Sequence, residues 1–191
     1  SALSSGSGIV NSQTGGTFRA AGRPFVSKDI DLHVGVSAIS AFKVAANCAT
    51  GSNAACTRSF GFGQSPEVNL TTTNLAAAVV SNASSVWAAG PELGFRWKNL
   101  LLKGEYYHIG VTRGDTANMG QNNQSTVNLE GYYASANYTL LGKGRAYNEK
   151  EGAFGAPGVE QEFDPKHGHW GALELTGRYS VTDFHDVAIT G

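Results

Sequence analysis

Apolar and polar residues alternate with a period of two along much of this chain, and no other feature constrains the fold as strongly. In the stretch 30–37 all four even positions are apolar, while Asp31, His33 and Ser37 occupy odd positions. Alternate side chains of a β-strand point to opposite faces of the sheet, so the pattern predicts strands with one apolar and one polar face. The same alternation covers residues 17–25, 30–46, 92–97, 102–107, 129–141 and 173–181. We expect about nine strands in all and an all-β fold.

The lengths of the apolar runs separate two kinds of membrane protein. The longest uninterrupted run extends from Leu75 to Val80, whereas a membrane-spanning helix needs roughly 18–20 apolar residues. A helical membrane protein is therefore excluded. A membrane β-barrel is not excluded, because its strands need only about 9–11 residues of alternating character.

The composition bears on the possible partners. The formal net charge is −1, whereas nucleic-acid-binding domains carry a strong surplus of basic residues. Charged residues make up 15% of the chain, against roughly 25% in ordinary soluble domains. Small and polar residues replace them, and the mean hydropathy is only −0.20. We expect no nucleic-acid partner.

Two architectures fit strands with unlike faces. In a soluble β-sandwich the apolar face forms the core, whereas in a membrane barrel it meets lipid and the polar face lines the lumen. Large aromatic residues recur on the predicted apolar face, as the interfacial girdles of a barrel require. They are Trp97, Tyr106, Tyr138 and Tyr179. We favour the barrel, with the sandwich as the alternative.

The connections between predicted strands alternate in length. Short ones lie at residues 25–29, 64–66, 98–99 and 142–144, and longer polar ones at 47–56, 113–125 and 160–168. An up-and-down barrel with short periplasmic turns and long outer loops predicts this alternation.

The chain's two cysteines, Cys48 and Cys56, flank a small polar stretch. We interpret them as a disulfide that closes a loop tip in an oxidising compartment, with two free thiols as the alternative. A metal site is not expected, because there is no further cysteine and no histidine lies nearby.

Several segments resemble the family of phosphate-selective porins of the O and P type. The resemblance begins at Phe18-Arg-Ala-Ala-Gly-Arg-Pro-Phe25 and continues through Asp31-Leu-His-Val-Gly-Val-Ser37. It continues through Leu102-Lys-Gly-Glu-Tyr-Tyr107, Gly131 to Gly142, Arg145-Ala-Tyr147, Gly152-Ala-Phe-Gly155 and Trp170 to Ser180. The segments follow the family in the same order over residues 18–186.

The resemblance implies an antiparallel, up-and-down transmembrane β-barrel in the outer membrane of Gram-negative bacteria. It also implies a barrel of 16 strands, of which residues 1–191 cover about half as a single porin domain, incomplete at one or both ends. The implied partners are two further copies in a homotrimer, outer-membrane lipid and lipopolysaccharide. No cofactor is implied.

The polar face supplies the candidate pore-lining residues. The cations are Arg19, Arg23, Arg96, Lys103 and Arg178, and the acidic residues are Glu105 and Glu174. Guanidinium groups offer planar donors suited to phosphate or carboxylate. The alternative is structural, since the cations could pair with Glu92, Glu105 or Glu174 and hold the wall together.

No sequence pattern indicates an enzyme, because neither a G-x-S-x-G nucleophile motif nor a P-loop occurs. We interpret His167 and His169, with Asp164, as solvated loop residues rather than a metal site. Lys143, Arg145 and Lys150 read as a solvated turn. The predicted function is passive diffusion of small anionic solutes through a water-filled pore, with phosphate as one candidate solute. The alternative is a secreted or surface β-sandwich that acts in binding or adhesion.

Overall fold

The computed structural model describes residues 9–10, 13–48, 58–64, 76–114 and 125–184, and these residues form an all-β protein. The strands are β1 (Ile9–Val10), β2 (Thr14–Val26), β3 (Ile30–Lys43), β4 (Asn47–Cys48), β5 (Ser59–Gln64), β6 (Ala76–Ser81), β7 (Ala83–Trp97), β8 (Leu100–Arg113), β9 (Thr126–Leu141), β10 (Tyr147–Asn148), β11 (Ala153–Phe154) and β12 (Leu173–Asp183). One short 3-10 helix, η1 (Pro165–His167), lies before β12. Within the described ranges, no helix is both long and apolar enough to cross a membrane.

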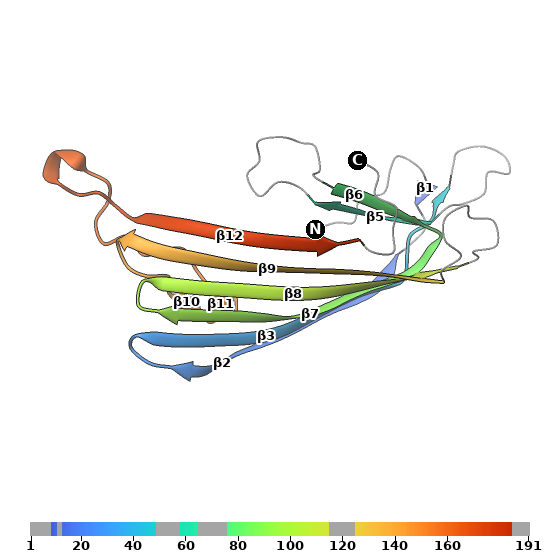
Figure 1. The fold of residues 1–191 in the computed structure, drawn as a ribbon, viewed down its shortest axis with the longest axis horizontal. Coiled ribbons are helices and arrows are strands. Elements are labelled where there is room, and N and C mark those ends of the chain that lie inside the picture. The colour runs from blue at the N-terminus through green and yellow to red at the C-terminus, as the bar shows by residue number, and fades with distance from the viewer. Residues whose placement is uncertain (1–8, 11–12, 49–57, 65–75, 115–124, 185–191) are drawn as a thin grey trace.

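Six strands form one curved sheet in the order β12-β9-β8-β7-β3-β2, and every neighbouring pair is antiparallel (Figure 1). Long strands that follow one another along the chain are neighbours in the sheet, with the short strands inserted between them. This is the up-and-down arrangement, and it confirms the predicted fold class. The strands β2 and β12 lie at the two edges of the sheet.

The register of the sheet aligns apolar positions with apolar positions, and polar with polar, on neighbouring strands. Leu32, Phe95, Leu102 and Ala136 form one continuous row of paired positions on β3, β7, β8 and β9. The next row holds Asp31, Arg96, Leu101 and Asn137, which point to the other side. Residues that share a row share a face, so the sheet as a whole has one apolar and one polar face.

The apolar face is exposed. Leu93 and Val36 in its middle are 52% and 45% exposed, and Tyr179 at its edge is 64% exposed. Along the described strands, no second sheet covers these side chains, so they do not form the dry interior of a β-sandwich. A contiguous apolar surface of this extent is rare on a protein in water, and it is the surface that a membrane barrel turns to lipid.

Aromatic side chains border this apolar band in two rows. Leu100 is paired with both Trp97 and Tyr138, so these two aromatic residues lie at one level. Tyr106 and Tyr132 are paired directly at a second level. The six-residue step from Leu100 to Tyr106 spans roughly 20 Å at about 3.4 Å per residue. The spacing approaches the apolar band of about 25 Å, flanked by aromatic girdles, that outer-membrane barrels present.

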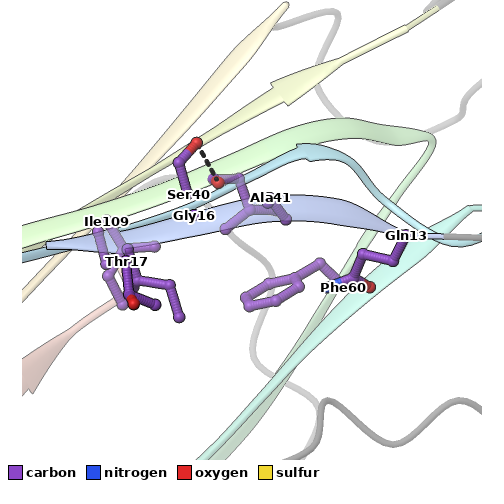
Figure 2. Close-up of a pocket in the computed structure, with 11 residues that line it drawn as sticks. Gln13, Gly16, Thr17, Ser40, Ala41, Phe60 and Ile109 are labelled. Atoms are coloured by element: carbon purple, nitrogen blue, oxygen red, sulfur yellow. Dashed lines mark hydrogen bonds between the residues drawn. The ribbon is translucent and has the colours of Figure 1, made fainter.

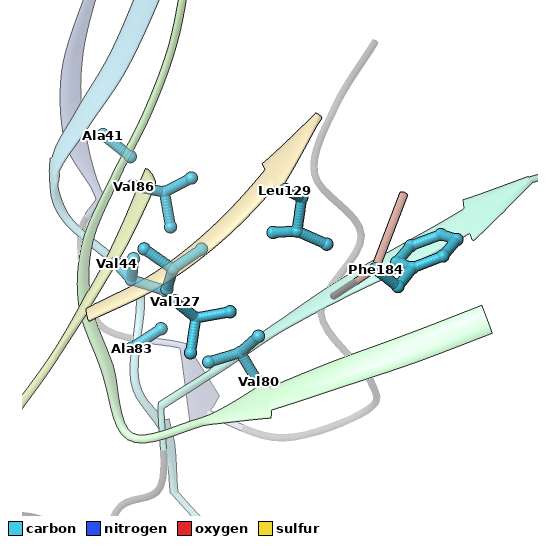
Figure 3. Packing of buried hydrophobic residues seen from close by; sticks show 9 residues of the cluster. Ala41, Val44, Val80, Ala83, Val86, Val127, Leu129 and Phe184 are labelled. Atoms are coloured by element: carbon cyan, nitrogen blue, oxygen red, sulfur yellow. The ribbon is translucent and has the colours of Figure 1, made fainter. Parts of the chain in front are cut away.

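The polar face becomes apolar at one end, a feature that the alternation in the sequence did not predict. The buried cluster there contains Ala41, Val44, Val80, Ala83, Val86, Val111, Val127, Leu129 and Phe184 (Figure 3). Phe60 and Phe62 of β5 pack against it, so the β5–β6 hairpin covers this end of the sheet. Burial under the hairpin explains why apolar residues stand at positions that elsewhere carry polar side chains.

The two ends of the sheet differ in their connections. Short turns at residues 27–29 and 98–99 lie at one end, here called the turn end. At the opposite end, here called the loop end, β3 and β8 end and β7 and β9 begin. The expected short turn at 142–144 is wrong, because residues 142–172 form one long connection from β9 to β12 at the turn end. The segment 160–168, expected as a separate outer loop, belongs to this connection.

Two predictions concern residues outside the described ranges. The disulfide between Cys48 and Cys56 lies outside the described residues, because Cys56 belongs to the segment 49–57. The predicted turn at 64–66 extends into the segment 65–75, which lies outside the described residues as well. Both stay predictions.

Candidate pore-lining face

All seven predicted pore-lining residues stand on the polar face of the main sheet. The register pairs Arg19 with Ser37, Lys103 with Gly94 and Ser135, and Arg178 with Ser135. It also pairs Glu105 with Glu92, and Glu174 with Thr139. The period of two was therefore sufficient to assign the face.

Glu92 is the centre of one charged cluster. The Nε and Nη2 atoms of Arg19 donate to its Oε1 at 3.1 and 2.6 Å. The Nε2 atom of His33 lies 3.2 Å from the same oxygen, and only 7% of the His33 side chain is exposed. Sequence reasoning named Glu92 as a partner but missed His33. The odd position of His33 within residues 30–37 was nevertheless sufficient to assign its side chain to the polar face.

A second cluster surrounds Asp31, whose side chain is 2% exposed. Arg23 donates to both carboxylate oxygens, at 3.0 Å from Nε and 2.6 Å from Nη2. Arg96 lies further away, with its Nη2 atom 3.9 Å from Oδ2. A buried carboxylate needs such charge-assisted bonds to offset its lost hydration. Asp31 was not among the predicted site residues, because its burial comes from the three-dimensional packing.

The β9–β12 connection folds back onto this face. We call residues 145–155 the inward segment; β10 and β11 form its small hairpin. Arg19 donates to the backbone carbonyls of Glu151 and Gly152, both at 2.9 Å. Arg23 reaches Glu149 at 3.3 Å. The inward segment therefore lies against the charged part of the polar face of the sheet.

Aromatic residues complete the contact between the inward segment and the wall. The Tyr147 hydroxyl lies 2.9 Å from Nδ1 of His33. The guanidinium carbon of Arg23 stands 4.5 Å from the centre of the Tyr147 ring. Phe154 packs edge-on against Tyr147 at 5.2 Å and is buried.

Arg145 corrects another expectation. It does not belong to a solvated turn: its Nε and Nη2 donate to the two carboxylate oxygens of Glu174 at 2.8 and 2.6 Å. Its Nη1 donates to the carbonyl of Gly155 at 3.0 Å. The Glu174 carboxylate raises the pKa of the Arg145 guanidinium above its ordinary value, so this ion pair keeps its positive partner.

The other predicted residues stand on β8 and on the edge strand β12. The Tyr133 hydroxyl donates to Glu105 at 2.5 Å, and the Arg178 guanidinium stacks on the Tyr133 ring at 3.7 Å. Within the described part of the chain, Lys103 makes neither an ion pair nor a side-chain hydrogen bond. Tyr133 was missed by sequence reasoning, which weighed only charged groups.

A cavity of about 420 Å³ opens on the polar face toward the loop end (Figure 2). It is lined mainly by apolar groups, among them Ile39, Ala41, Phe60 and Ile109. The hydroxyl of Ser40 donates to the Val86 carbonyl at 3.3 Å and is thereby occupied. A second cavity of about 320 Å³ adjoins it and is lined partly by Arg19, Glu92 and Glu105. The face thus grades from apolar at the loop end to charged at the turn end.

His167 is exposed, as expected of a solvated loop residue, whereas His169 is partly buried. His167 is 73% exposed and lies 2.5 Å from a carboxylate oxygen of Asp164, three residues earlier. Among the described residues, no group of at least three His, Cys, Asp or Glu side chains could hold a metal ion.

Comparison with known proteins adds one match. A family model described as phosphate-selective porin O and P matches residues 5–190, which is nearly the whole chain. No curated protein and no solved structure matches.

Proposed function

Because this chain belongs to the family of phosphate-selective porins O and P, we propose that the polar face of its six-stranded sheet lines the water-filled channel of a bacterial outer-membrane porin. One observation carries the proposal: the apolar face is exposed between two aromatic rows, whereas charged side chains of both signs gather on the opposite face. Contact with lipid explains the exposed apolar face, and contact with channel water explains the charged face.

Proteins of this family are channels, and the channel's physical task is to remove a desolvation barrier. An ion that enters hydrocarbon loses its hydration at a cost of many kcal/mol. A wetted wall with fixed charges keeps the solute hydrated, so that the pore's width and the signs of its lining groups decide what passes. No bond is made or broken.

Small anions, phosphate included, are the solutes that we propose for the channel. Guanidinium and ammonium groups on the polar face attract these anions. Arg96, Lys103 and Arg178 are the cations that we propose for the path of the anions. Carboxylates at Asp31, Glu92, Glu105 and Glu174 offset much of this charge. We therefore expect moderate anion preference rather than exclusive selection.

The inward segment narrows the proposed channel at the turn end. It stands against the wall on the polar side and occupies space that the lumen would otherwise provide. The turn end corresponds to the periplasmic side in an up-and-down barrel with short periplasmic turns.

The assembly is part of the proposal. Open strand edges are costly in lipid, so we propose that further strands join β2 and β12 to close the barrel. We also propose a homotrimer whose outer wall contacts lipid and lipopolysaccharide. The His108–Glu130 pair, at 3.0 Å, lies just beyond the row of Tyr106 and Tyr132, on strand positions suited to polar headgroups.

Planar-bilayer recording tests the function. Purified channels should give ohmic current steps, and the zero-current potential under a salt gradient should have the sign of an anion-preferring pore. Phosphate added at constant chloride should reduce the chloride current if both anions share the path. A chain that stays folded in buffer without detergent and gives no current steps would overturn the proposal in favour of a soluble module.

A further inference from the structure

The cations of the polar face fall into two groups with different surroundings. We propose that Arg19, Arg23 and Arg145 fasten the inward segment to the wall and so set the pore's width, and that Lys103 is a selectivity-determining residue. The inference rests on the proposed channel. It divides residues that sequence reasoning had treated as one set.

Arg19 keeps only one of its five N–H donors, on Nη1, for a passing anion. Its Nε and Nη2 bind Glu92, and its Nη1 and Nη2 bind the carbonyls of Glu151 and Gly152. A guanidinium has five N–H donors in a fixed planar fork, and these four bonds use three nitrogens. A solute anion that takes the usual paired contact with two guanidinium donors would have to displace either the Glu92 carboxylate or the inward segment.

Two further arginines join the inward segment to the wall. Arg23 of the wall binds the Asp31 carboxylate through two nitrogens and Glu149 of the inward segment through the third. Arg145 belongs to the inward segment and binds the wall carboxylate of Glu174 through two nitrogens, while its third nitrogen binds the carbonyl of Gly155 within the segment. In all three cases two nitrogens of one guanidinium bind a wall carboxylate, and the same guanidinium connects this carboxylate to the inward segment.

The wall is also shaped to receive the inward segment. A Cβ atom at Gly94 would lie 2.8 Å from Phe154, so only glycine permits this close approach. Gly152 has a φ of +60°, and a Cβ atom there would lie 3.2 Å from Nη1 of Arg19. The polar contacts and the packing therefore specify the same docked position.

Lys103 has the opposite environment. Its paired positions on the neighbouring strands are Gly94 and Ser135, which leave room for a long side chain. Within the described residues its ammonium group has no carboxylate partner. Gly94 is the residue that Phe154 covers, so Lys103 stands beside the narrowed part of the channel. A flexible, strongly hydrated ammonium group at this position acts on ions as they pass.

The decisive variant removes a fastening without changing the net charge of the wall. In the double variant Arg19→Gln/Glu92→Gln, a cation and an anion are lost together. We expect single-channel conductance to rise about twofold with added current noise, because the inward segment loses one of its three connections to the wall. The zero-current potential should stay at the wild-type value. Heat-modifiable gel migration checks that the barrel has folded.

Lys103→Gln is the matched comparison. It should move the zero-current potential toward the cation-selective side by more than the double variant does, with a smaller change in conductance. If the double variant keeps wild-type conductance, or shifts the potential as much as Lys103→Gln, Arg19 is not a fastening and the inference fails. If the wild-type protein forms no channels, the proposed function itself fails.

A disulfide provides a rescue. A Cβ atom at Gly152 lies 3.8 Å from the Cβ atom of Ala21, within the range of about 3.5–4.5 Å that disulfides require. Ala21→Cys/Gly152→Cys, added to the double variant with Cys48 and Cys56 replaced by serine, should restore wild-type conductance when oxidised and lose it when reduced. Conductance that stays high in the oxidised, cross-linked channel would overturn the inference.

Discussion

The hydroxyl of Tyr147 and the Nδ1 atom of His33 lie 2.9 Å apart, although 114 positions separate the two residues in the sequence. The contact joins β10 in the inward segment to β3 in the wall. Around it the ring of Tyr147 also meets Arg23 and Phe154. The contact between Tyr147 and His33 therefore holds part of the β9–β12 connection against the sheet.

Removing this hydroxyl should weaken the docking with little effect on packing. We expect Tyr147→Phe to lower the free energy of unfolding by about 1 kcal/mol, the usual net value of one hydrogen bond. Urea titration of the detergent-solubilised barrel measures it. Tyr179→Phe, on the exposed apolar face, is the control and should be neutral; equal effects of the two variants would contradict the role of the hydroxyl.

Asp31 should be the most sensitive carboxylate of the wall. Its side chain is 2% exposed and binds Arg23 through both oxygens. Asp31→Ala leaves guanidinium groups without their partner, and we expect a loss of roughly 2–4 kcal/mol in unfolding free energy.

The control for Asp31 is Glu130→Gln. Glu130 pairs with His108 at 3.0 Å, but 53% of its side chain is exposed. Exposed pairs contribute about 0–1 kcal/mol. Urea midpoints that fall equally for the two variants would show that burial does not govern the strength of these ion pairs.

The apolar face should reject charge because it meets lipid. Leu93 is 52% exposed and lies between the two aromatic rows. Leu93→Arg should cost about 2–4 kcal/mol in lipid vesicles. A soluble surface would tolerate the same change within about 0.5 kcal/mol. Thr126→Arg, beyond the Tyr106–Tyr132 row, is the matched control and should fold normally.

Charge reversal on the polar face should change ion preference. Arg178 stacks on Tyr133 on the predicted lumen side, and we expect Arg178→Glu to shift the zero-current potential under a salt gradient toward cations. Arg96→Glu should act in the same direction, with some loss of folded protein, because the new carboxylate would stand near Asp31. Unchanged ion selectivity in both variants would place these residues outside the narrow path.

The sequence by itself determined the strands and their faces. A period of two assigns each side chain of β3, β7, β8 and β9 to one face without knowledge of its neighbours. Every predicted pore-lining residue therefore stands on the polar face, and Trp97, Tyr106, Tyr138 and Tyr179 are exposed on the other.

The tertiary structure alone decided what those side chains meet. Arg19 lies 133 positions from Gly152, whose carbonyl it binds, and no local pattern encodes a contact across that separation. The burial of Asp31, the pairing of Arg145 with Glu174 and the apolar cluster under β5 and β6 arise from connections that have no regular period. Periodicity specifies the direction in which a side chain points, whereas its partner depends on how distant segments pack together.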